Sequence, residues 1–294
     1  MMGKKSAKSK EAGKEKLFGA EGFEKYYGDL YGDRWYSIKD SFAGEGSAVE
    51  YHVTGAQQSY FLDSASVLAA LCLPLENAEN LLDLCAAPGG KTLVLASRMP
   101  DDAKLSSNER SPERKHRLAN VVQTCLPAEI SERVITSCSD GATWCTRQSE
   151  CFDHILLDAP CSSERHVIAD PKYLNTWSPS RIKTVTTEQW ALLSSAYRLL
   201  SPQGILLYST CALCPEENDG MIERLYKKFN KDGSAFTLLE PEPDLNQVSA
   251  FAPSLTLPGF EKTQYGYMIM PDRQNGAGPI YFSIIRKEKT CFTS

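Results

Sequence analysis

The stretch Leu81-Leu82-Asp83-Leu84-Cys85-Ala86-Ala87-Pro88-Gly89-Gly90-Lys91-Thr92 decides how the rest of the chain is interpreted. An apolar run ends in a loop of small residues, and a helical pattern follows from Thr92 to Met99. This order of strand, glycine-containing turn and helix N-terminus is where open α/β sheets bind nucleotide-like cofactors. Small residues let the backbone approach a ligand, and the free N–H groups at the helix start face it.

Three kinds of ligand fit this loop unequally. A P-loop matches Gly90-Lys91-Thr92, with 155–158 as its metal-binding partner strand, but Cys85 replaces its first glycine, and Asp83 and Pro88 suit a phosphate poorly. A dinucleotide site would need Gly-x-Gly-x-x-Gly, which is absent. A smaller, positively charged cofactor would benefit from the Asp83 carboxylate. A tight turn without any ligand is the fourth interpretation.

Composition sets the class of protein. The chain has 294 residues, of which 42% are hydrophobic, so it can bury a full core, and one α/β domain with a smaller preface is expected. No apolar run approaches membrane-spanning length, and no signal-peptide pattern is present. The ten cysteines are scattered through apolar segments, which predicts reduced thiols. The net charge of −5 predicts that any contact with nucleic acid is local or shared with a partner.

Three regions follow from the composition along the chain. Residues 1–20 are predicted to be a disordered basic tail, because six Lys and two Glu lie among Gly, Ser and Ala in its first 16 positions. Residues 21–79 are predicted to be a preface packed on the core. Its aromatic side chains are expected to pack in a core rather than stack on RNA. They are Phe23, Tyr26, Tyr27, Tyr31, Trp35, Tyr36 and Phe42.

Residues 80–290 are predicted to form the main domain, because short β-rich runs alternate with helical stretches. That alternation predicts a mostly parallel, doubly wound sheet with crossover helices. The expected strands are 80–85, 103–108, 132–138, 152–158 and 203–210. The expected helices are 91–99, 111–125, 142–149, 180–200 and 215–230. Two further strands are expected at 264–270 and 279–286.

Acidic residues follow the predicted strands in a series. Asp83 and Asp158 end the first and fourth strands. Glu109 follows the second, where a carboxylate could accept both hydroxyls of a ribose, and Asp140 follows the third, where it could accept from an adenine amino group. Each acid alone is more often a helix cap or a turn residue. Together, at the sheet edge where ligands bind, they favour a cofactor site.

Two cysteines are expected at the same edge. Cys161 lies in Asp158-Ala159-Pro160-Cys161-Ser162-Ser163 after the fourth strand, and Cys211 ends Tyr208-Ser209-Thr210-Cys211 after the fifth. Two thiols and an acid suit methylation of carbon 5 of a pyrimidine. That carbon becomes nucleophilic only after a thiolate adds to carbon 6, and an acid near ring nitrogen 3 stabilises the developing charge. The residues alone do not decide which thiol attacks.

Cys211 and Cys214 also form a Cys-x-x-Cys pair, which raises a redox or zinc interpretation. No second pair stands at zinc spacing, and no metal site is expected. A redox role would leave the series of acids unexplained.

Three ordered motifs carry a family resemblance. Residues 83–92, Asp158-Ala159-Pro160-Cys161-Ser162, and Ser209-Thr210-Cys211 with Pro215-Glu216-Glu217-Asn218 resemble the signatures of the NSUN (Sun-domain) RNA cytosine-5 methyltransferases, over about residues 60 to 287. The resemblance implies a Rossmann-like class I methyltransferase fold with an antiparallel C-terminal strand. It also implies S-adenosylmethionine as cofactor. Residues 32–38 and 164–166 are similar to the compact branch that includes the mitochondrial members.

The same resemblance implies roles for individual residues. Cys211 would be the nucleophile and Cys161 would assist product release, whereas DNA cytosine-5 methyltransferases use the Pro-Cys thiol as nucleophile. Lys91 and Asp158 would line the base and methyl site, and Glu109 and Asp140 would hold ribose and adenine. The cofactor site would comprise Cys85, Ala86, Ala87, Pro88, Gly89, Gly90, Lys91, Glu109, Asp140 and Asp158.

The RNA surface is weakly marked in the sequence. Arg165 and His166 stand closest to the predicted chemistry and are the candidates for RNA contacts. The basic residues at 110–117 are expected to form a solvated helix face. The family's appended RNA-binding modules are not recognisable, so a protein partner is expected to supply part of the RNA affinity.

The function predicted from the sequence is RNA cytosine-5 methylation of rRNA or tRNA through a covalent cysteine–cytosine intermediate. We expect an intracellular location, in the cytoplasm or the mitochondrial matrix, with no membrane association. The alternative function is a catalytically idle RNA-binding or ribosome-assembly factor on the same fold. The presence of Cys161, Asp158 and Cys211 together argues against the idle factor.

Overall fold

The computed structural model of the chain describes residues 17–44, 47–230, 233–245 and 251–289. The predicted basic tail at 1–20 lies mostly outside the described residues. Its last two residues, Gly19 and Ala20, already belong to the first helix. No helix in the described ranges is both long and apolar enough to cross a membrane.

A nine-stranded sheet organises the chain. Its parallel part has the order β5-β4-β3-β6-β7. These strands are β3 (Asn80–Asp83), β4 (Lys104–Glu109), β5 (Val134–Cys138), β6 (Phe152–Asp158) and β7 (Leu200–Thr210). All five predicted parallel strands are therefore confirmed.

The C-terminal strands extend this sheet. β11 (Ile280–Lys287) runs antiparallel to β7, which confirms the predicted antiparallel strand. β10 (Tyr267–Ile269) is antiparallel to β11 and so runs in the direction of the five parallel strands. β9 (Glu261–Lys262) and β8 (Phe236–Leu239) pair with β10 and β11 and were not predicted.

Helices cover both faces of the sheet. Each central strand contributes side chains to two cores, since successive residues of a strand point to opposite faces. In β6, Leu156 belongs to one core, while Ile155 and Leu157 belong to the other. One core is closed by α3 (Ser64–Leu71), α4 (Gly90–Ala96) and α5 (Pro112–Cys125). The other is closed by α9 (Pro179–Leu199) and α10 (Asp219–Phe229), and side chains of α1 (Gly19–Tyr31) and α2 (Arg34–Ser41) join it at the end of the sheet. Burial on both faces explains why these strands read as continuous apolar runs.

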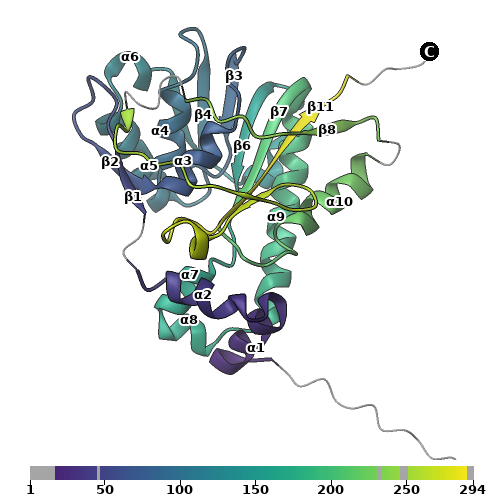
Figure 1. Cartoon of the computed structure of the whole chain (residues 1–294). Coiled ribbons are helices and arrows are strands. Elements are labelled where there is room, and N and C mark those ends of the chain that lie inside the picture. The colour runs from purple at the N-terminus through teal and green to yellow at the C-terminus, as the bar shows by residue number, and fades with distance from the viewer. Residues whose placement is uncertain (1–16, 45–46, 231–232, 246–250, 290–294) are drawn as a thin grey trace, which may run out of the picture.

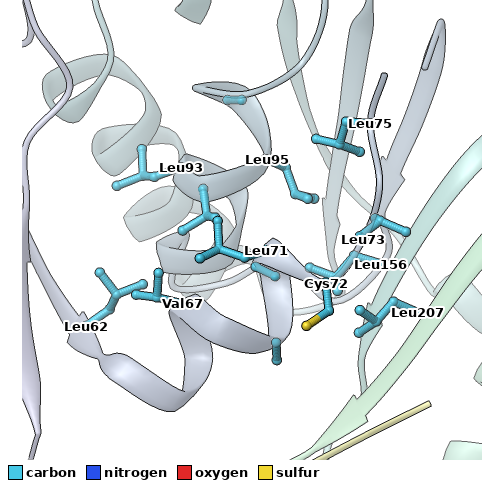
Figure 2. Close-up of a cluster of buried hydrophobic side chains, with 14 of the residues drawn as sticks. Leu62, Val67, Leu71, Cys72, Leu73, Leu75, Leu93, Leu95, Leu156 and Leu207 are labelled. Atoms are coloured by element: carbon cyan, nitrogen blue, oxygen red, sulfur yellow. The ribbon is translucent and has the colours of Figure 1, made fainter. Parts of the chain in front are cut away.

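Figure 2 shows the first of these cores, in which leucine and valine side chains of α3 and α4 meet the sheet. Seven of the labelled leucine and valine side chains are fully buried, and each contributes about 1.5–3 kcal/mol relative to exposure. They are Val67, Leu71, Leu73, Leu93, Leu95, Leu156 and Leu207. The segment that forms α3 was predicted as part of the preface, and the structure builds it into the core of the sheet domain.

The rest of the preface lies at the end of the molecule where the parallel strands finish. α1 and α2 gather there with α7 (Glu164–Ala169) and α8 (Pro171–Asn175), as Figure 1 shows. The packing predicted for the aromatic residues holds for Phe23, Tyr27 and Trp35, which are at most 2% exposed. It is wrong for Tyr36, which is 71% exposed. After α2 in the chain, β1 (Ala48–Tyr51) and β2 (Tyr60–Asp63) form an antiparallel pair.

Several predicted helices differ from those in the structure. The helix expected at 142–149 is instead the short 3₁₀ helix η1 (Gly141–Thr146), which begins where the Asp140 carboxylate accepts from the Ala142 N–H. The helix expected from 215 begins at Asp219, because the N–H groups of Glu217 and Asn218 bond back to the carbonyls of Cys214 and Pro215 in a turn. The short elements α6 (Ala128–Ser131), α7, α8 and η2 (Pro271–Arg273) were not predicted.

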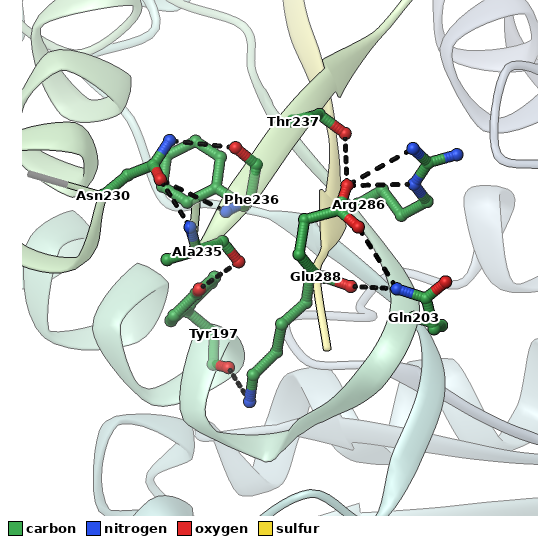
Figure 3. Close-up of polar contacts among 9 residues, drawn as sticks. Tyr197, Gln203, Asn230, Ala235, Phe236, Thr237, Arg286 and Glu288 are labelled. Atoms are coloured by element: carbon green, nitrogen blue, oxygen red, sulfur yellow. Dashed lines mark hydrogen bonds and ion pairs between the residues drawn. The ribbon is translucent and has the colours of Figure 1, made fainter. Parts of the chain in front are cut away.

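Side-chain hydrogen bonds hold β8 and the end of β11 to their surroundings, far from the strand ends that carry the acidic residues (Figure 3). The Asn230 side chain accepts from Ala235 N and donates to the Phe236 carbonyl. The Tyr197 hydroxyl donates to the Ala235 carbonyl at 3.1 Å. Glu288 accepts from the Thr237 hydroxyl at 2.9 Å. These contacts satisfy the polar groups at the edge of the sheet.

Candidate functional site

The loops after β3, β4, β6 and β7 meet at one edge of the sheet, because parallel strands end together. The turn after β3 passes into α4 through Gly89, whose φ is +121°. Residues with a Cβ rarely adopt this conformation, and an added Cβ would also meet Val121 at 3.0 Å. Glycine at this position therefore allows the tight strand-to-helix turn predicted from the sequence.

A first cavity, of about 180 Å³, lies over this turn. Its walls include the predicted residues Cys85, Ala86, Ala87, Pro88, Gly90, Lys91 and Asp158, together with Tyr60, Phe61 and Ser66. Gly89, which was also predicted, is not in the wall of this cavity, and its role is to allow the tight turn between β3 and α4.

Asp83 forms the floor of this cavity and is 1% exposed. Its Oδ2 accepts from the Thr92 hydroxyl at 2.7 Å, while its Oδ1 is buried without a hydrogen-bond partner. Burial raises the pKa of this carboxyl to about 7, and the nearby Asp158 charge acts in the same direction. A buried carboxylate oxygen that lacks a donor suits a ligand carrying a positive charge.

A second cavity, of about 450 Å³, continues from the first, because Cys85 belongs to both walls. Glu109 and Asp140 line it, as predicted, with Asn108 and Leu192. Glu109 accepts from Ser111 N at 2.9 Å and pairs with Arg114 at 3.3 Å. Asp83 in the first cavity and Glu109 and Asp140 in the second provide the polarity expected for a nucleoside attached to a positively charged chain.

Lys91 and Asp158 form an ion pair between the first cavity and the cysteines. Lys91 Nζ lies 2.7 Å from Asp158 Oδ2, and the Ser209 hydroxyl donates to Asp158 Oδ1 at 2.9 Å. Burial opposes the charge on Lys91, but the contact with Asp158 outweighs burial, so the Lys91 pKa ends above its usual range. The pair thus keeps a fixed ammonium group at the strand ends.

The two predicted cysteines are in contact. Cys161 Sγ and Cys211 Sγ lie 2.6 Å apart, and either thiol can donate to the other. The hydrogen bond with Cys211 and burial raise the pKa of Cys161 well above its usual value, with further contributions from the charges of Glu217 and Glu164. Cys211 instead interacts electrostatically with the Lys91 ammonium and the Arg165 guanidinium. The surroundings therefore favour a Cys161 thiol that keeps its proton.

Buried polar side chains hold the two cysteine loops. The Thr210 hydroxyl donates to the Asn218 side chain at 2.6 Å, and Asn218 Nδ2 donates to the Ala212 carbonyl at 2.9 Å. Glu217 accepts from Ser162 N and from the Gln189 amide, both at 2.9 Å. Burial and the neighbouring Glu164 charge raise the Glu217 pKa to about 7. The residues 215–218, which the sequence analysis used only as a motif, thus fix both loops.

A third cavity, of about 190 Å³, opens beside Cys211. Its walls are Asp63, Ser66, Ser163, Arg165, Cys211 and residues 278–280. Of the two residues predicted to contact RNA, Arg165 lines this cavity, stacks on Phe42 and donates to the Gly276 carbonyl. His166 is exposed and lies beside the Tyr173 ring, outside the wall of the cavity.

Sequence reasoning missed three contributions to this third cavity. Asp63 and Ser66 come from the start of α3, and residues 278–280 come from the start of β11. Asp63-Ser64 is a sequence typical of a helix start, and in the structure Asp63 accepts from Ala65 N at the start of α3. No local pattern in the sequence, however, places that helix beside Cys211.

The redox and zinc interpretations of Cys211 and Cys214 gain no support from the contacts. The Cys211 sulfur faces Cys161, whereas the Cys214 thiol donates to Glu216 at 2.9 Å. Within the described ranges, no group of three metal-ligating side chains is found.

A family model described as 16S rRNA methyltransferase RsmB/F matches residues 70–274 of the chain. Among curated relatives, ribosomal RNA small subunit methyltransferase F of Aliivibrio salmonicida is 34% identical over 77% of this chain and 46% of its own length. The mouse 5-cytosine rRNA methyltransferase NSUN4 is 31% identical over 78% of this chain and 60% of its own. The zebrafish mitochondrial tRNA (cytosine(34)-C(5))-methyltransferase is 30% identical over 81% of this chain and 63% of its own. The chain thus spans about half to three fifths of these relatives.

Solved structures share the fold. A methyltransferase homologue from Pyrococcus horikoshii matches with a TM-score of 0.65 and 23% identity, over 90% of this chain and 94% of its own. NSun6 from the same organism, solved with the S-adenosylmethionine analogue SFG, matches with a TM-score of 0.61 and 22% identity, over 80% of this chain and 54% of its own. These likenesses confirm the predicted Rossmann-like methyltransferase fold.

Proposed function

The chain belongs to the 16S rRNA methyltransferase RsmB/F family, and on that basis we propose that it is an S-adenosylmethionine-dependent RNA cytosine-5 methyltransferase. The family resemblance seen in the three sequence motifs is thereby confirmed. The substrate proposed is an rRNA or a tRNA, since relatives named for each class match at similar identity.

The contact between Cys161 and Cys211 is the observation that carries this proposal. Cys211 lines the third cavity and interacts electrostatically with Lys91, and Ser66 belongs to the walls of both the first and the third cavity. One cavity offers room for a methyl donor and the other for a flipped base. Methylation needs a thiol that adds to carbon 6 of the cytosine and a methyl donor at carbon 5, and this arrangement would supply both.

The residues around the first two cavities fit S-adenosylmethionine. Asp83, with its unpartnered Oδ1, would face the positive charge of the methionine part, and Glu109 and Asp140 would hold ribose and adenine. When bound, the cofactor supplies an electrophilic methyl group on a sulfonium ion. The walls formed by residues 85–91 would orient that group toward the thiols.

In the proposed reaction, the Cys211 thiolate adds to carbon 6 of the target cytosine and forms a carbon–sulfur bond. The electron pair of the 5,6 double bond moves to carbon 5, which takes the methyl group. Asp158, held by Lys91 and Ser209, would stabilise the protonated ring at nitrogen 3. A base such as water then takes the carbon 5 proton, and the electron pair of that bond re-forms the 5,6 double bond as the carbon–sulfur bond breaks. Nitrogen 3 returns its proton to solvent, which restores the ring. Cys161, held as a thiol, would assist this release by donating a proton to the departing sulfur.

Arg165 would contact the RNA at the third cavity, because its guanidinium lies in the wall next to Cys211. His166 would contact flanking nucleotides from the exposed surface. A protein partner or a folded ribosomal or transfer RNA would supply the remaining affinity. We propose that the enzyme works inside the cell, in the cytoplasm or the mitochondrial matrix, as supported by its bacterial and mitochondrial relatives.

Cofactor affinity is expected to depend on pH through Asp83. Its carboxyl, with a pKa of about 7, is protonated below that pH and charged above it, and a cationic ligand binds the charged form. Calorimetry should therefore show S-adenosylmethionine binding roughly tenfold more tightly at pH 7.0 than at pH 5.5. Asp83→Asn should abolish this dependence. Equal affinities at the two pH values would exclude the role of Asp83.

RNA affinity of the isolated chain is expected to be low. Because the net charge is −5, phosphate contacts must be local, and binding to a short unstructured RNA should be weaker than about 1 μM at physiological salt. The affinity should fall further as salt rises. Fluorescence anisotropy across a salt series measures both effects, and nanomolar binding to such an RNA would contradict the need for a partner or a folded substrate.

The proposed activity is tested by transfer of a labelled methyl group to total rRNA and tRNA, followed by bisulfite mapping of the modified cytosine. RNA from cells that lack this protein is the best acceptor, since its target position is unmodified. Methyl transfer to one cytosine is expected. RNA binding without any transfer would instead support the idle RNA-binding or assembly factor.

A further inference from the structure

The tyrosines of α1 make contacts that packing alone does not require. Buried aromatic rings could be phenylalanines, because a buried hydroxyl is costly unless it finds a partner. Tyr27 is fully buried, and its hydroxyl donates to Glu164 Oε1 at 2.5 Å. The Tyr31 hydroxyl donates to the Leu213 carbonyl at 2.7 Å. Both hydroxyls therefore reach the segments that carry the two cysteines.

Glu164 joins three parts of the chain. It is fully buried and accepts from the Tyr27 hydroxyl of α1, the Ser162 hydroxyl after Cys161 and the Leu213 N–H after Cys211, the last at 2.8 Å. Its two oxygens act only as acceptors, which is what a carboxylate requires. Burial and the Glu164 charge raise the Tyr27 pKa well above its usual value, so this hydroxyl keeps its proton and donates.

Leu213 is held from both sides. Its N–H bonds to Glu164 and its carbonyl accepts from Tyr31, two positions after the proposed nucleophile. The next residue, Cys214, and Glu216 meet the Tyr26 hydroxyl at 3.6 and 3.2 Å. Three hydroxyls of one preface helix thus surround the loop that follows β7.

We propose that α1 is part of the catalytic machinery, and that Tyr27, Tyr31 and Glu164 are positioning residues that hold the Cys211 loop in place for attack on the base. The proposal deepens the proposed methyl transfer and rests on it for its kinetic consequences. The position of the loop itself can be measured without methyl transfer.

The test compares Tyr27→Phe, Tyr31→Phe and Glu164→Gln with Tyr197→Phe in the full chain. Phenylalanine keeps each ring and removes one hydroxyl, and glutamine turns one accepting oxygen into a donor that faces donors. Tyr197 is the matched control, because its hydroxyl donates to the Ala235 carbonyl far from the cysteines (Figure 3).

Turnover should fall about tenfold in the two tyrosine variants and about a hundredfold in Glu164→Gln, because small displacements of reacting groups are costly. The KM values for cofactor and RNA should stay within about twofold. In the double variant that combines Glu164→Gln with Tyr27→Phe, the second change should lower turnover by less than about twofold, since the partner of the Tyr27 hydroxyl is already lost. Tyr197→Phe should match the wild type.

Hydrogen exchange gives the readout that does not depend on activity. The Leu213 amide should exchange at least about tenfold faster in Glu164→Gln and in Tyr27→Phe, while α1 itself remains protected. A merely structural role would instead raise KM and speed exchange throughout α1. Unchanged exchange at Leu213 overturns the proposal even if the wild type methylates RNA. If the Leu213 amide exchanges faster in the variants but the wild type transfers no methyl group, the proposed function alone would be rejected.

Discussion

Cys211→Ala is expected to abolish methyl transfer, with a loss of at least about a thousandfold in turnover, as is typical when a covalent nucleophile is removed. The reason lies in the substrate, because carbon 5 of cytosine becomes nucleophilic only after a thiolate has added at carbon 6. Cys161 loses its hydrogen bond to Cys211 in this variant, but its burial still raises the pKa of its thiol, so we do not expect it to take over the attack. Cofactor affinity should be unchanged, because Cys211 is not in the wall of the first or second cavity.

Cys151→Ala is the matched control for this variant. Cys151 stands just before β6, at the end of the strand opposite Asp158 and thus about 20 Å from it. The control should turn over like the wild type. If Cys211→Ala methylates RNA at the wild-type rate, the covalent mechanism is wrong for this protein.

Cys161→Ala is expected to give a different defect with a comparably large effect. The attack and the methyl transfer should still occur once, since Cys211, Lys91 and Asp158 remain in place. Release should then be slow, because the thiol proposed to protonate the departing Cys211 sulfur is missing. Multiple turnover should fall by about a hundredfold or more, while a stable protein–RNA adduct accumulates.

Denaturing gel electrophoresis after incubation with cofactor and RNA shows this adduct directly. The adduct should be absent from Cys211→Ala and from the variant that lacks both thiols. The opposite result, an adduct in Cys211→Ala and none in Cys161→Ala, would mean that the arrangement of the DNA enzymes applies.

The positions of the strands along the chain and the edge that carries the site could be predicted from the sequence, because both follow from local patterns. β3, β6 and β7 are buried on both faces and so read as apolar runs, and their carboxyl ends must share one edge. Asp83, Asp158, Cys161 and Cys211 therefore come together as expected. Residues alone left the choice of thiol open, and the assignment of Cys211 as nucleophile is a proposal that rests on the family resemblance and is supported by the raised pKa of Cys161.

Contacts between distant segments could not be predicted, because no local pattern records them. Tyr27 and Glu164 are separated by 137 positions in the chain, yet they meet in one hydrogen bond. Asp63 and Ser66 carried at most a helix-start signal, although both line the cavity beside Cys211. The 3₁₀ helix η1 had the composition of an ordinary helix. It begins at Gly141, which packs against Leu84, where an added Cβ would come within 2.8 Å.

The most direct test of the covalent mechanism is the identity of the cysteine bonded to the base. An RNA carrying 5-fluorocytidine at the mapped position traps the wild-type protein after methyl transfer, because fluorine cannot leave carbon 5 as a proton does. Mass spectrometry of the digested adduct should find the nucleotide on the peptide that contains Cys211, with one added methyl group. A nucleotide on the Cys161 peptide, or no adduct with an RNA that is otherwise methylated, would contradict the proposed mechanism.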